Sequence, residues 1–224
     1  SPSSKLRQAI GSNLALPSLP SSSPQENQPL GTIGHYGVFS FYPTKNITTG
    51  DGGMVLTRNS DKVGRIRVMA SQGLSSGAWD RYGSGPIKEY EVEISGVKGL
   101  MPDLNAAIGR EQLIRWPEMK RIRSEVFKVY EKYLGKKPEG HSQHIYAIQN
   151  EDRNALRKRL HMAGIGTGVH YNPLHLEPAY RFLGYKKGNF PLAESIGEKT
   201  VSLPLSSSMN TEEAFRVVEA LKAR

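Results

Sequence analysis

Two short apolar runs flanking a glycine-rich loop constrain this chain more than any other feature. Residues 38–41 (VFSF) and 54–57 (MVLT) carry the β-branched and aromatic residues typical of strands. A single lysine, Lys45, lies in the loop just past the first run. The loop also holds the turn-forming residues Pro43, Gly50, Gly52 and Gly53. A lysine held at a strand end can form a Schiff base with a carbonyl compound, whereas an isolated loop lysine is usually just solvated.

The loop as a whole decides between these two alternatives. The string FSFYPTKNITTGDGG, residues 39–53, resembles the signature of the DegT/DnrJ/StrS-type sugar-nucleotide aminotransferases. The resemblance implies that Lys45 carries pyridoxal phosphate (PLP) and that the hydroxyl of Ser40 binds the cofactor phosphate. Related dehydratases have histidine in place of this lysine, so Lys45 favours transamination. Asp51 departs from the glutamate that the family usually has. The string LNAAIGREQL, residues 104–113, is also similar to the family's sequence.

The N-terminal region fits the resemblance less well. Residues 8–11 (QAIG) resemble the end of the family's Asp-Ala-Ala-Gln-Ala-x-Gly element, which implies that Gln8 binds the cofactor. The aspartate of that element supports the pyridine nitrogen, but Lys5 stands in its place here. Residues 16–30 are rich in proline and serine and predict a linker. An insertion, a frame error or a truncation relative to the family could each explain these departures, and we expect an N-terminal truncation.

A second resemblance covers the C-terminal part of the chain. GIGTGVHYNPLHLEPAYRFLGY, residues 164–185, together with residues 189–205, is similar to the family's small domain. His170 and Tyr171 are candidates for substrate contact, and the alternative for His170 is an ordinary surface or core histidine. His144 and His175 are open to the same two interpretations. No His/Asp/Glu cluster has the spacing of a metal site.

These observations predict an α/β protein of PLP-dependent transferase fold type I, made of the C-terminal part of the large domain and the small α/β domain. The predicted domains are an irregular segment 1–30, the remainder of the large domain 31–116, and the small domain 117–224. Helical spacing and caps predict helices at 59–72, 103–116, 117–134, 151–163, 191–200 and 211–224. Further strands are expected at 144–149 and 164–171. Pro117 is predicted to end one helix and begin the next. Asn59, Ser60 or Asp61 is expected to cap the first helix, and Asp103 the second. In the 151–163 helix, Met162 is expected to face inward.

Composition excludes several classes of protein. The 224 residues contain no cysteine, which excludes disulfides and thiol catalysis, and no apolar run long enough to span a bilayer. The net charge is +9, and basic residues are densest between Arg115 and Lys137. Apolar residues recur there at helical spacing, so we interpret the stretch as an amphipathic helix with a solvated basic face. No nucleic-acid-binding motif accompanies it.

The function predicted from the resemblance is amino transfer from glutamate to a keto-sugar nucleotide in amino-sugar or polysaccharide biosynthesis. We expect a cytoplasmic homodimer that binds neither nucleic acid nor membrane. The main alternative is an inactive remnant that serves only as a binding or dimerisation module. A basic nucleic-acid-binding regulator, suggested only by the net charge of +9, is a third and weaker hypothesis.

Overall fold

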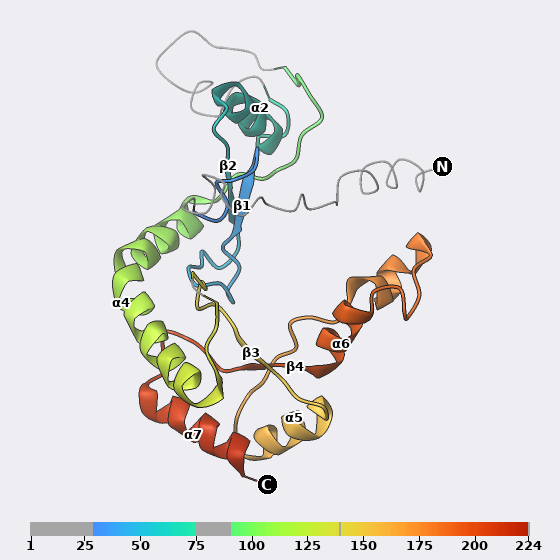
Figure 1. Cartoon of the computed structure of the whole chain (residues 1–224). Helices are drawn as coiled ribbons and strands as arrows, with labels where there is room; N and C mark the ends of the chain where they lie inside the picture. Colours follow the sequence, from blue (N-terminus) through green and yellow to red (C-terminus); the bar gives the residue numbers. More distant parts are fainter. Residues whose placement is uncertain (1–28, 75–90, 139, 224) are drawn as a thin grey trace, which may run out of the picture. The chain divides into compact units, whose positions relative to one another are not determined.

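The computed structural model describes residues 29–74, 91–138 and 140–223. These residues form two compact units (Figure 1). One holds the described residues up to Ser40 and those from Gly53 to Met101. The other holds Phe41–Gly52 and the described residues from Pro102 onward. The loop that carries Lys45 thus groups with the C-terminal part of the chain, whereas the strands on either side of it belong to the first unit. The predicted division at 1–30, 31–116 and 117–224 stays a prediction.

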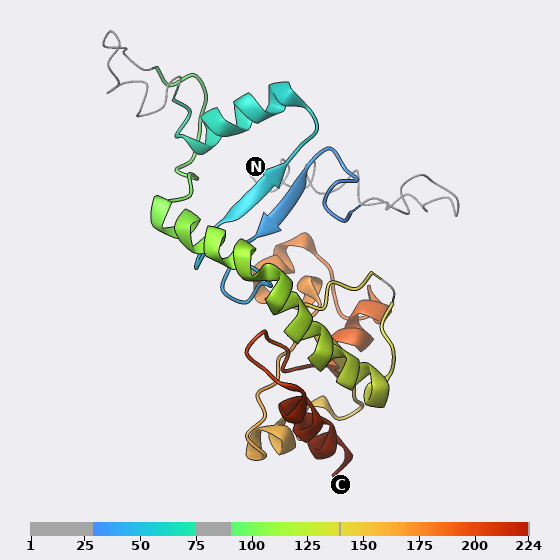
Figure 2. The same ribbon diagram turned by 90° about the vertical axis from the view of Figure 1, so that its left-hand side faces the viewer.

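The first unit is built on the two strands predicted on either side of the lysine loop. Strand β1 (Gly37–Ser40) pairs antiparallel with β2 (Gly53–Leu56), with Ser40 opposite Gly53. Figure 2 shows the two strands side by side. Both predicted strands are therefore confirmed, each displaced by one residue. Their pairing brings the two ends of the 41–52 loop together.

Helix α2 (Ser60–Ala70) follows β2 and confirms the predicted helix, and Asn59 is the cap among the three candidates. The Asn59 side chain accepts hydrogen bonds from the backbone N–H groups of Asp61 and Lys62, at 3.0 and 3.3 Å. These are two of the amide groups that have no partner within the helix, and an asparagine at this position satisfies them. The chain returns along residues 91–101, where isolated bridges join Leu74 to Val92 and Ser71 to Lys98.

Helix α4 (Asp103–Leu134) is one continuous helix, so the predicted break at Pro117 is wrong. Proline removes only the single N–H that would reach the carbonyl four residues earlier, and helices commonly bend there without ending. Figure 1 shows α4 curved rather than broken. The helix begins after Pro102, so Asp103 is its first residue and not its N-cap as expected. Beyond Pro117 the helix has a strongly buried side, which holds it in place.

The second unit surrounds a short antiparallel pair, β3 (Tyr146–Gln149) and β4 (Thr200–Leu203). All four β4 residues are buried, yet most of this strand lies outside the predicted elements. The strand predicted at residues 164–171 does not form, because only Gly168 bridges to this sheet, opposite Ser202. Helices α5 (Arg153–Met162) and α7 (Thr211–Lys222) complete the unit.

A single hydrophobic core holds these elements together. Tyr130 of α4 and Tyr146 of β3 are fully buried, and their rings lie 5.1 Å apart. Their hydroxyls donate to the carbonyls of Pro204 and Gly135, at 2.7 and 2.5 Å. A buried phenol needs such a partner, because an unsatisfied hydroxyl would oppose folding. Met162, which was expected to face inward, is 77% exposed, so that expectation is wrong.

Hydrogen bonds to the Glu194 carboxylate hold together part of the segment between β3 and β4. This segment holds two 3₁₀ helices, η1 (Leu174–Leu176) and η2 (Pro178–Leu183), and helix α6 (Pro191–Lys199). The buried Glu194 carboxylate accepts from the backbone N–H groups of Gly188 and Phe190 and from Nε2 of His175, which is 2.9 Å away. The hydrogen bond from Gly188, followed by those from His175 and Phe190, lowers the pKa of Glu194.

These contacts predict an acid-sensitive segment. Because the pKa of Glu194 is lower in the folded protein, its stabilising effect is complete above the ordinary value of 4.5 and is lost as pH falls below it. Glu194→Gln should lower Tm at pH 7 and flatten the dependence of Tm on pH between 6 and 3.5. Thermal melts monitored by circular dichroism measure both effects. Glu198→Gln, an exposed change on the same helix, should keep the wild-type slope of Tm against pH. If the Tm of Glu194→Gln changed with pH as steeply as that of the wild type, Glu194 would not be the acid-sensitive group.

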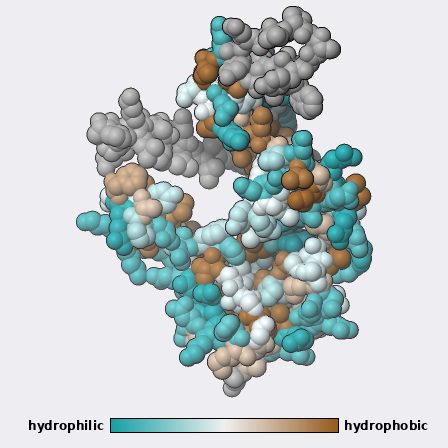
Figure 3. Space-filling view, turned by 180° about the vertical axis from the view of Figure 1, so that it is seen from behind, coloured by the Kyte–Doolittle hydropathy of each residue, from teal (hydrophilic) through white to brown (hydrophobic). Residues whose placement is uncertain are grey.

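Many apolar side chains stay exposed in each unit. Val38 of β1 and Val97 of the returning segment are 75% and 67% exposed in the first unit. In the second unit, Leu104 of α4, Leu174 of η1 and Leu192 of α6 are 82%, 67% and 74% exposed. Figure 3 shows hydrophobic residues, in brown, scattered among hydrophilic residues, in teal, on one face of the molecule. Exposed apolar surface of this extent is typical of proteins that bury it against a partner.

Candidate functional site

The loop that carries Lys45 is closed by its own backbone. Phe41 N–H donates to the Gly52 carbonyl at 2.9 Å, and Thr49 N–H donates to the Phe41 carbonyl at 3.0 Å. Lys45 N–H donates to the Tyr42 carbonyl at 2.9 Å, which makes a tight turn just before the lysine side chain. Gly50 and Gly52 have φ angles of +80° and +137°, which glycine adopts readily and other residues rarely do.

The first turns of α4 hold one side of this loop. The Asn105 side-chain amide donates to the carbonyl of Thr49 at 2.6 Å and to that of Asp51 at 3.4 Å. Thr49 is buried, and its methyl group packs against Gly109. A Cβ atom at Gly109 would stand only 2.8 Å from that methyl carbon, so the close approach needs glycine there. Two residues of the string LNAAIGREQL therefore position the loop: Asn105 through its side-chain amide, and Gly109 because it has no side chain.

Residues 141–145 hold the other side of the loop. The Asn46 side-chain amide donates to the Ser142 carbonyl at 3.0 Å, and Asn46 Oδ1 lies 3.2 Å from Nδ1 of His144. The guanidinium of Arg123 on α4 fixes this segment in turn. It donates to the carbonyls of Gln143 and His144, at 3.1 and 2.9 Å. Lys45 and its immediate neighbours are therefore fixed by residues about 100 positions later in the sequence.

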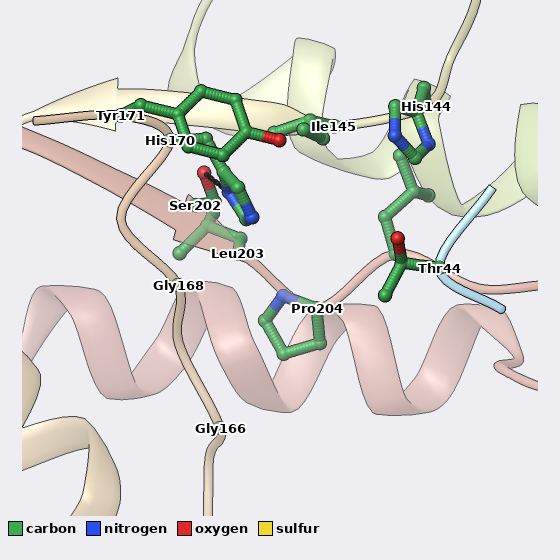
Figure 4. Close-up of a pocket in the computed structure, with 11 residues that line it drawn as sticks. Thr44, His144, Ile145, Gly166, Gly168, His170, Tyr171, Ser202, Leu203 and Pro204 are labelled. Carbon is green, nitrogen blue, oxygen red and sulfur yellow. Dashed lines mark hydrogen bonds between the residues drawn. The ribbon is translucent and has the colours of Figure 1, made fainter. Parts of the chain in front are cut away.

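A pocket of about 210 Å³ opens beside this loop, within the same unit (Figure 4). Thr44, the residue before Lys45, lines it together with His144, His170 and Tyr171. Lys45 itself is half-buried. The polar side chains around the pocket carry hydroxyls and imidazoles and no carboxylate, and Ile145, Leu203, Pro204 and Leu205 add apolar surface. Such a lining suits a polar ligand that is held by neutral hydrogen bonds.

His170 is held in a defined orientation. Its Nδ1 lies 2.8 Å from the hydroxyl of Ser202, which is buried on β4. Its ring contacts the ring of Tyr171 edge to face, with centroids 4.8 Å apart and planes at 82°. Figure 4 shows the hydrogen bond between His170 and Ser202 and the Tyr171 ring beside them. The two predicted substrate-contacting residues thus lie together at one wall of the pocket.

His144 stands in a cationic and partly desolvated environment. Burial is the largest cause that lowers the pKa of His144, followed by the positive charges of Lys45 and Arg123 and then His170 and His141. His144 is therefore neutral at neutral pH and can accept a proton or a hydrogen bond.

The structure brings together three of the five predicted site residues. Lys45, His170 and Tyr171 belong to the same compact unit, and the last two line the pocket. Ser40 ends β1 and belongs to the other unit, whereas Gln8 lies outside the described residues. The roles assigned to these five residues stay predictions. Within residues 29–74, 91–138 and 140–223 no group of three or more metal-ligating side chains was found.

Sequence reasoning missed several residues that shape the site. Thr44 adjoins Lys45, and its position alone could have indicated it. Asn105 lay in a string already noted as similar to the family, but nothing local connected its amide to Thr49. Ser202 belongs to the unpredicted strand β4, and His144 was left open between two roles. The partners of Asn105 and His144 are 56 and 98 residues away in sequence, a distance that no periodic pattern reveals.

Comparison with known proteins decides the family. The model of the DegT/DnrJ/EryC1/StrS aminotransferase family matches residues 9–222. The chain belongs to this family. Among solved structures, it is similar to the putative sugar aminotransferase Spr1654 of Streptococcus pneumoniae in its PMP-form, with a TM-score of 0.79 and 29% identity over 88% of this chain and 54% of that one. The predicted fold class is thereby confirmed.

Curated relatives agree with this family. The chain is 40% identical to the uncharacterized protein MJ1066 of Methanocaldococcus jannaschii and 37% identical to the spore coat polysaccharide biosynthesis protein SpsC of Bacillus subtilis. Each match covers 86% of this chain and 54% of the relative, so the chain spans about half the length of these proteins. The Streptococcus protein is also known in a PLP-form, and the predicted cofactor of the family, pyridoxal phosphate, is thereby confirmed.

Proposed function

We propose that this chain contributes the lysine-bearing half of the active site of a PLP-dependent aminotransferase. The proposed reaction moves an amino group from glutamate to a keto-sugar nucleotide in polysaccharide biosynthesis. One observation carries the proposal: Lys45 lies on a loop that is fixed on both sides, next to a pocket walled by His170 and Tyr171. Family membership and the similarity to SpsC support the reaction class.

The residues present fit the cofactor. A lysine amine on a fixed loop is the group that an aldehyde cofactor requires, and the hydroxyl and imidazole groups around the pocket are suitable hydrogen-bonding partners. When bound, pyridoxal phosphate supplies a carbonyl that receives the amino group and a ring that withdraws electrons. Lys45 would hold it, with Ser40 donating its hydroxyl to the phosphate and Gln8 as a further contact.

The protein side of the reaction is proton transfer and orientation. The Nζ atom of Lys45, once free, is the base for the 1,3-proton shift of the amino transfer. His170, fixed by Ser202, and Tyr171 would orient the substrate at the pocket wall. A hydrogen bond formed by a pre-oriented imidazole costs less entropy than one formed by a mobile side chain, so the Ser202 contact favours binding.

Assembly and location complete the proposal. The exposed apolar side chains of α4, among them Leu104, Leu113 and Ile114, suit burial against a second copy, which supports a homodimer. We place the enzyme in the cytoplasm, where nucleotide-linked sugars would be available. Among the described helices, none has the length and apolar character needed to cross a bilayer.

Amino transfer by this chain is tested directly with defined reactants. Purified protein is incubated with PLP, glutamate and nucleotide-linked keto sugars, and the products are separated and identified by mass spectrometry. We expect 2-oxoglutarate and an amino-sugar nucleotide in equal amounts, and neither when glutamate is omitted. A cofactor-loaded protein that forms neither product would contradict the proposal and would favour the alternative of a binding or dimerisation module.

A further inference from the structure

The contacts of Asn46 fix the orientation of its side-chain amide. The nitrogen of the amide faces the Ser142 carbonyl, which can only accept a hydrogen bond. The oxygen therefore faces Nδ1 of His144, at 3.2 Å. An amide oxygen cannot donate, so Nδ1 must carry the proton. The structure thereby assigns the tautomer of His144 as Nδ1–H, with the lone pair on Nε2.

Several hydrogen bonds fix residues 141–144, the segment that carries His144. Arg123, itself buried, donates to the carbonyls of both Gln143 and His144. Gln143 has φ of +54°, an uncommon conformation for a residue other than glycine. Its side chain accepts from Ser124 at 2.6 Å, and its backbone N–H donates to Nδ1 of His141 at 2.9 Å. Strained backbone persists only where its surroundings enforce it, and it concentrates at functional sites.

We propose that His144 is a positioning residue for Lys45: as an Nδ1–H donor it fixes Asn46, and with it the turn that carries the lysine. The chain of contacts runs from Arg123 through the His144 backbone and ring to Asn46, the residue next to Lys45. The same ring lines the pocket, and its Nε2 remains an acceptor. The catalytic part of this inference rests on the proposed aminotransferase function, whereas the tautomer and the rigidity of the turn do not.

The electrostatic environment of the His144 ring favours the neutral form that this positioning role requires. Four groups with positive or titratable character influence it: Lys45 from the loop, Arg123 from α4, His141 from the same segment and His170 from the opposite pocket wall. All four disfavour the imidazolium form, as does burial. A neutral ring has one donor nitrogen and one acceptor nitrogen, so at neutral pH Nδ1 can donate to Asn46 while Nε2 accepts.

The tautomer can be measured without any cofactor or substrate. Long-range ¹H–¹⁵N spectra of the wild-type chain at pH 7.5 distinguish a protonated from an unprotonated ring nitrogen. We expect the His144 spectrum of a neutral Nδ1–H ring. A neutral Nε2–H ring would overturn the proposal, because that tautomer cannot donate to Asn46.

Two nearly isosteric variants separate the positioning role from mere packing. In His144→Asn the amide nitrogen lies about where ring Nδ1 stood, so the donor to Asn46 is kept. In His144→Gln the amide reaches the place of Nε2, and that donor is lost. A net hydrogen bond corresponds to about a fivefold change in an equilibrium constant. We expect amide hydrogen exchange at residues 44–48 to rise about fivefold in the Gln variant and less than twofold in the Asn variant.

The kinetics of the two His144 variants test whether the positioning of Lys45 affects catalysis. In a chain active in amino transfer, His144→Gln should lower kcat about tenfold with little change in KM for glutamate, because misplacing Lys45 affects chemistry more than binding. His144→Asn should restore most of kcat. Equal exchange rates in both variants and the wild type would refute the positioning role. If the tautomer and the exchange rates agree with expectation but no variant or wild type transfers an amino group, the proposed function fails and the positioning of Lys45 stands.

Discussion

Replacing Lys45 with alanine is expected to abolish amino transfer, with kcat reduced by a factor of about 10³ or more. The change removes the group that would hold the cofactor and, at the same time, the base that moves the proton, and general acid–base catalysis alone contributes about 10²–10⁴. The loop itself should persist, because its hydrogen bonds come from the Lys45 backbone and from Asn46, Thr49 and Asp51. The loss is measured as the rate of 2-oxoglutarate formation.

The control for this variant is Lys128→Ala. Lys128 is an exposed lysine on α4 in the same compact unit, and its loss removes one charge without touching the pocket. We expect it to keep wild-type kcat and the same far-UV circular dichroism spectrum as Lys45→Ala. Substantial amino transfer by Lys45→Ala would exclude this lysine as the catalytic group.

Tyr146→Ala is expected to have the largest effect on stability. Tyr146 is fully buried, its ring packs against Phe127 and Tyr130, and Lys137 Nζ lies 4.5 Å from the ring centroid. Removal of a buried aromatic side chain costs about 3–5 kcal/mol, which is a large fraction of the stability of a typical domain. Urea unfolding followed by circular dichroism should show a much lower midpoint or a protein that does not fold.

The matched variant Tyr146→Phe separates packing from hydrogen bonding. It keeps the ring in the core and removes only the hydroxyl that donates to the Gly135 carbonyl. We expect a loss of about 1 kcal/mol, the usual net contribution of one hydrogen bond. If Tyr146→Ala were no less stable than Tyr146→Phe, the buried position of the ring would be contradicted.

Local patterns in the sequence were sufficient for most of the helices. The cap at Asn59 and the apolar spacing of Ala214, Val217 and Val218 are short-range signals, and α2 and α7 formed where expected. The errors came from tertiary context. Pro117 is tolerated inside α4, and residues 164–171 satisfy strand propensity but find one bridge at Gly168 instead of a partner strand.

In the candidate site, too, local patterns identified some residues and tertiary packing determined the others. Lys45 could be found from the sequence because its neighbours form a continuous motif, and the pairing of β1 with β2 follows from the two apolar runs around it. The residues that hold the lysine could not be found so directly. His144 and Asn105 reach the loop only after α4 and residues 141–145 have packed beside it, and the geometry of that packing is a property of the whole unit.

The central claim is that Lys45 bonds covalently to pyridoxal phosphate. The direct test is to treat the purified chain with the cofactor, reduce it with borohydride, which converts the lysine–pyridoxal linkage into a stable amine, and map the labelled peptides by mass spectrometry. We predict a phosphopyridoxyl group on Lys45 in the wild-type protein and none at this peptide in Lys45→Ala. Labelling confined to other lysines, or no labelling at all, would contradict the account.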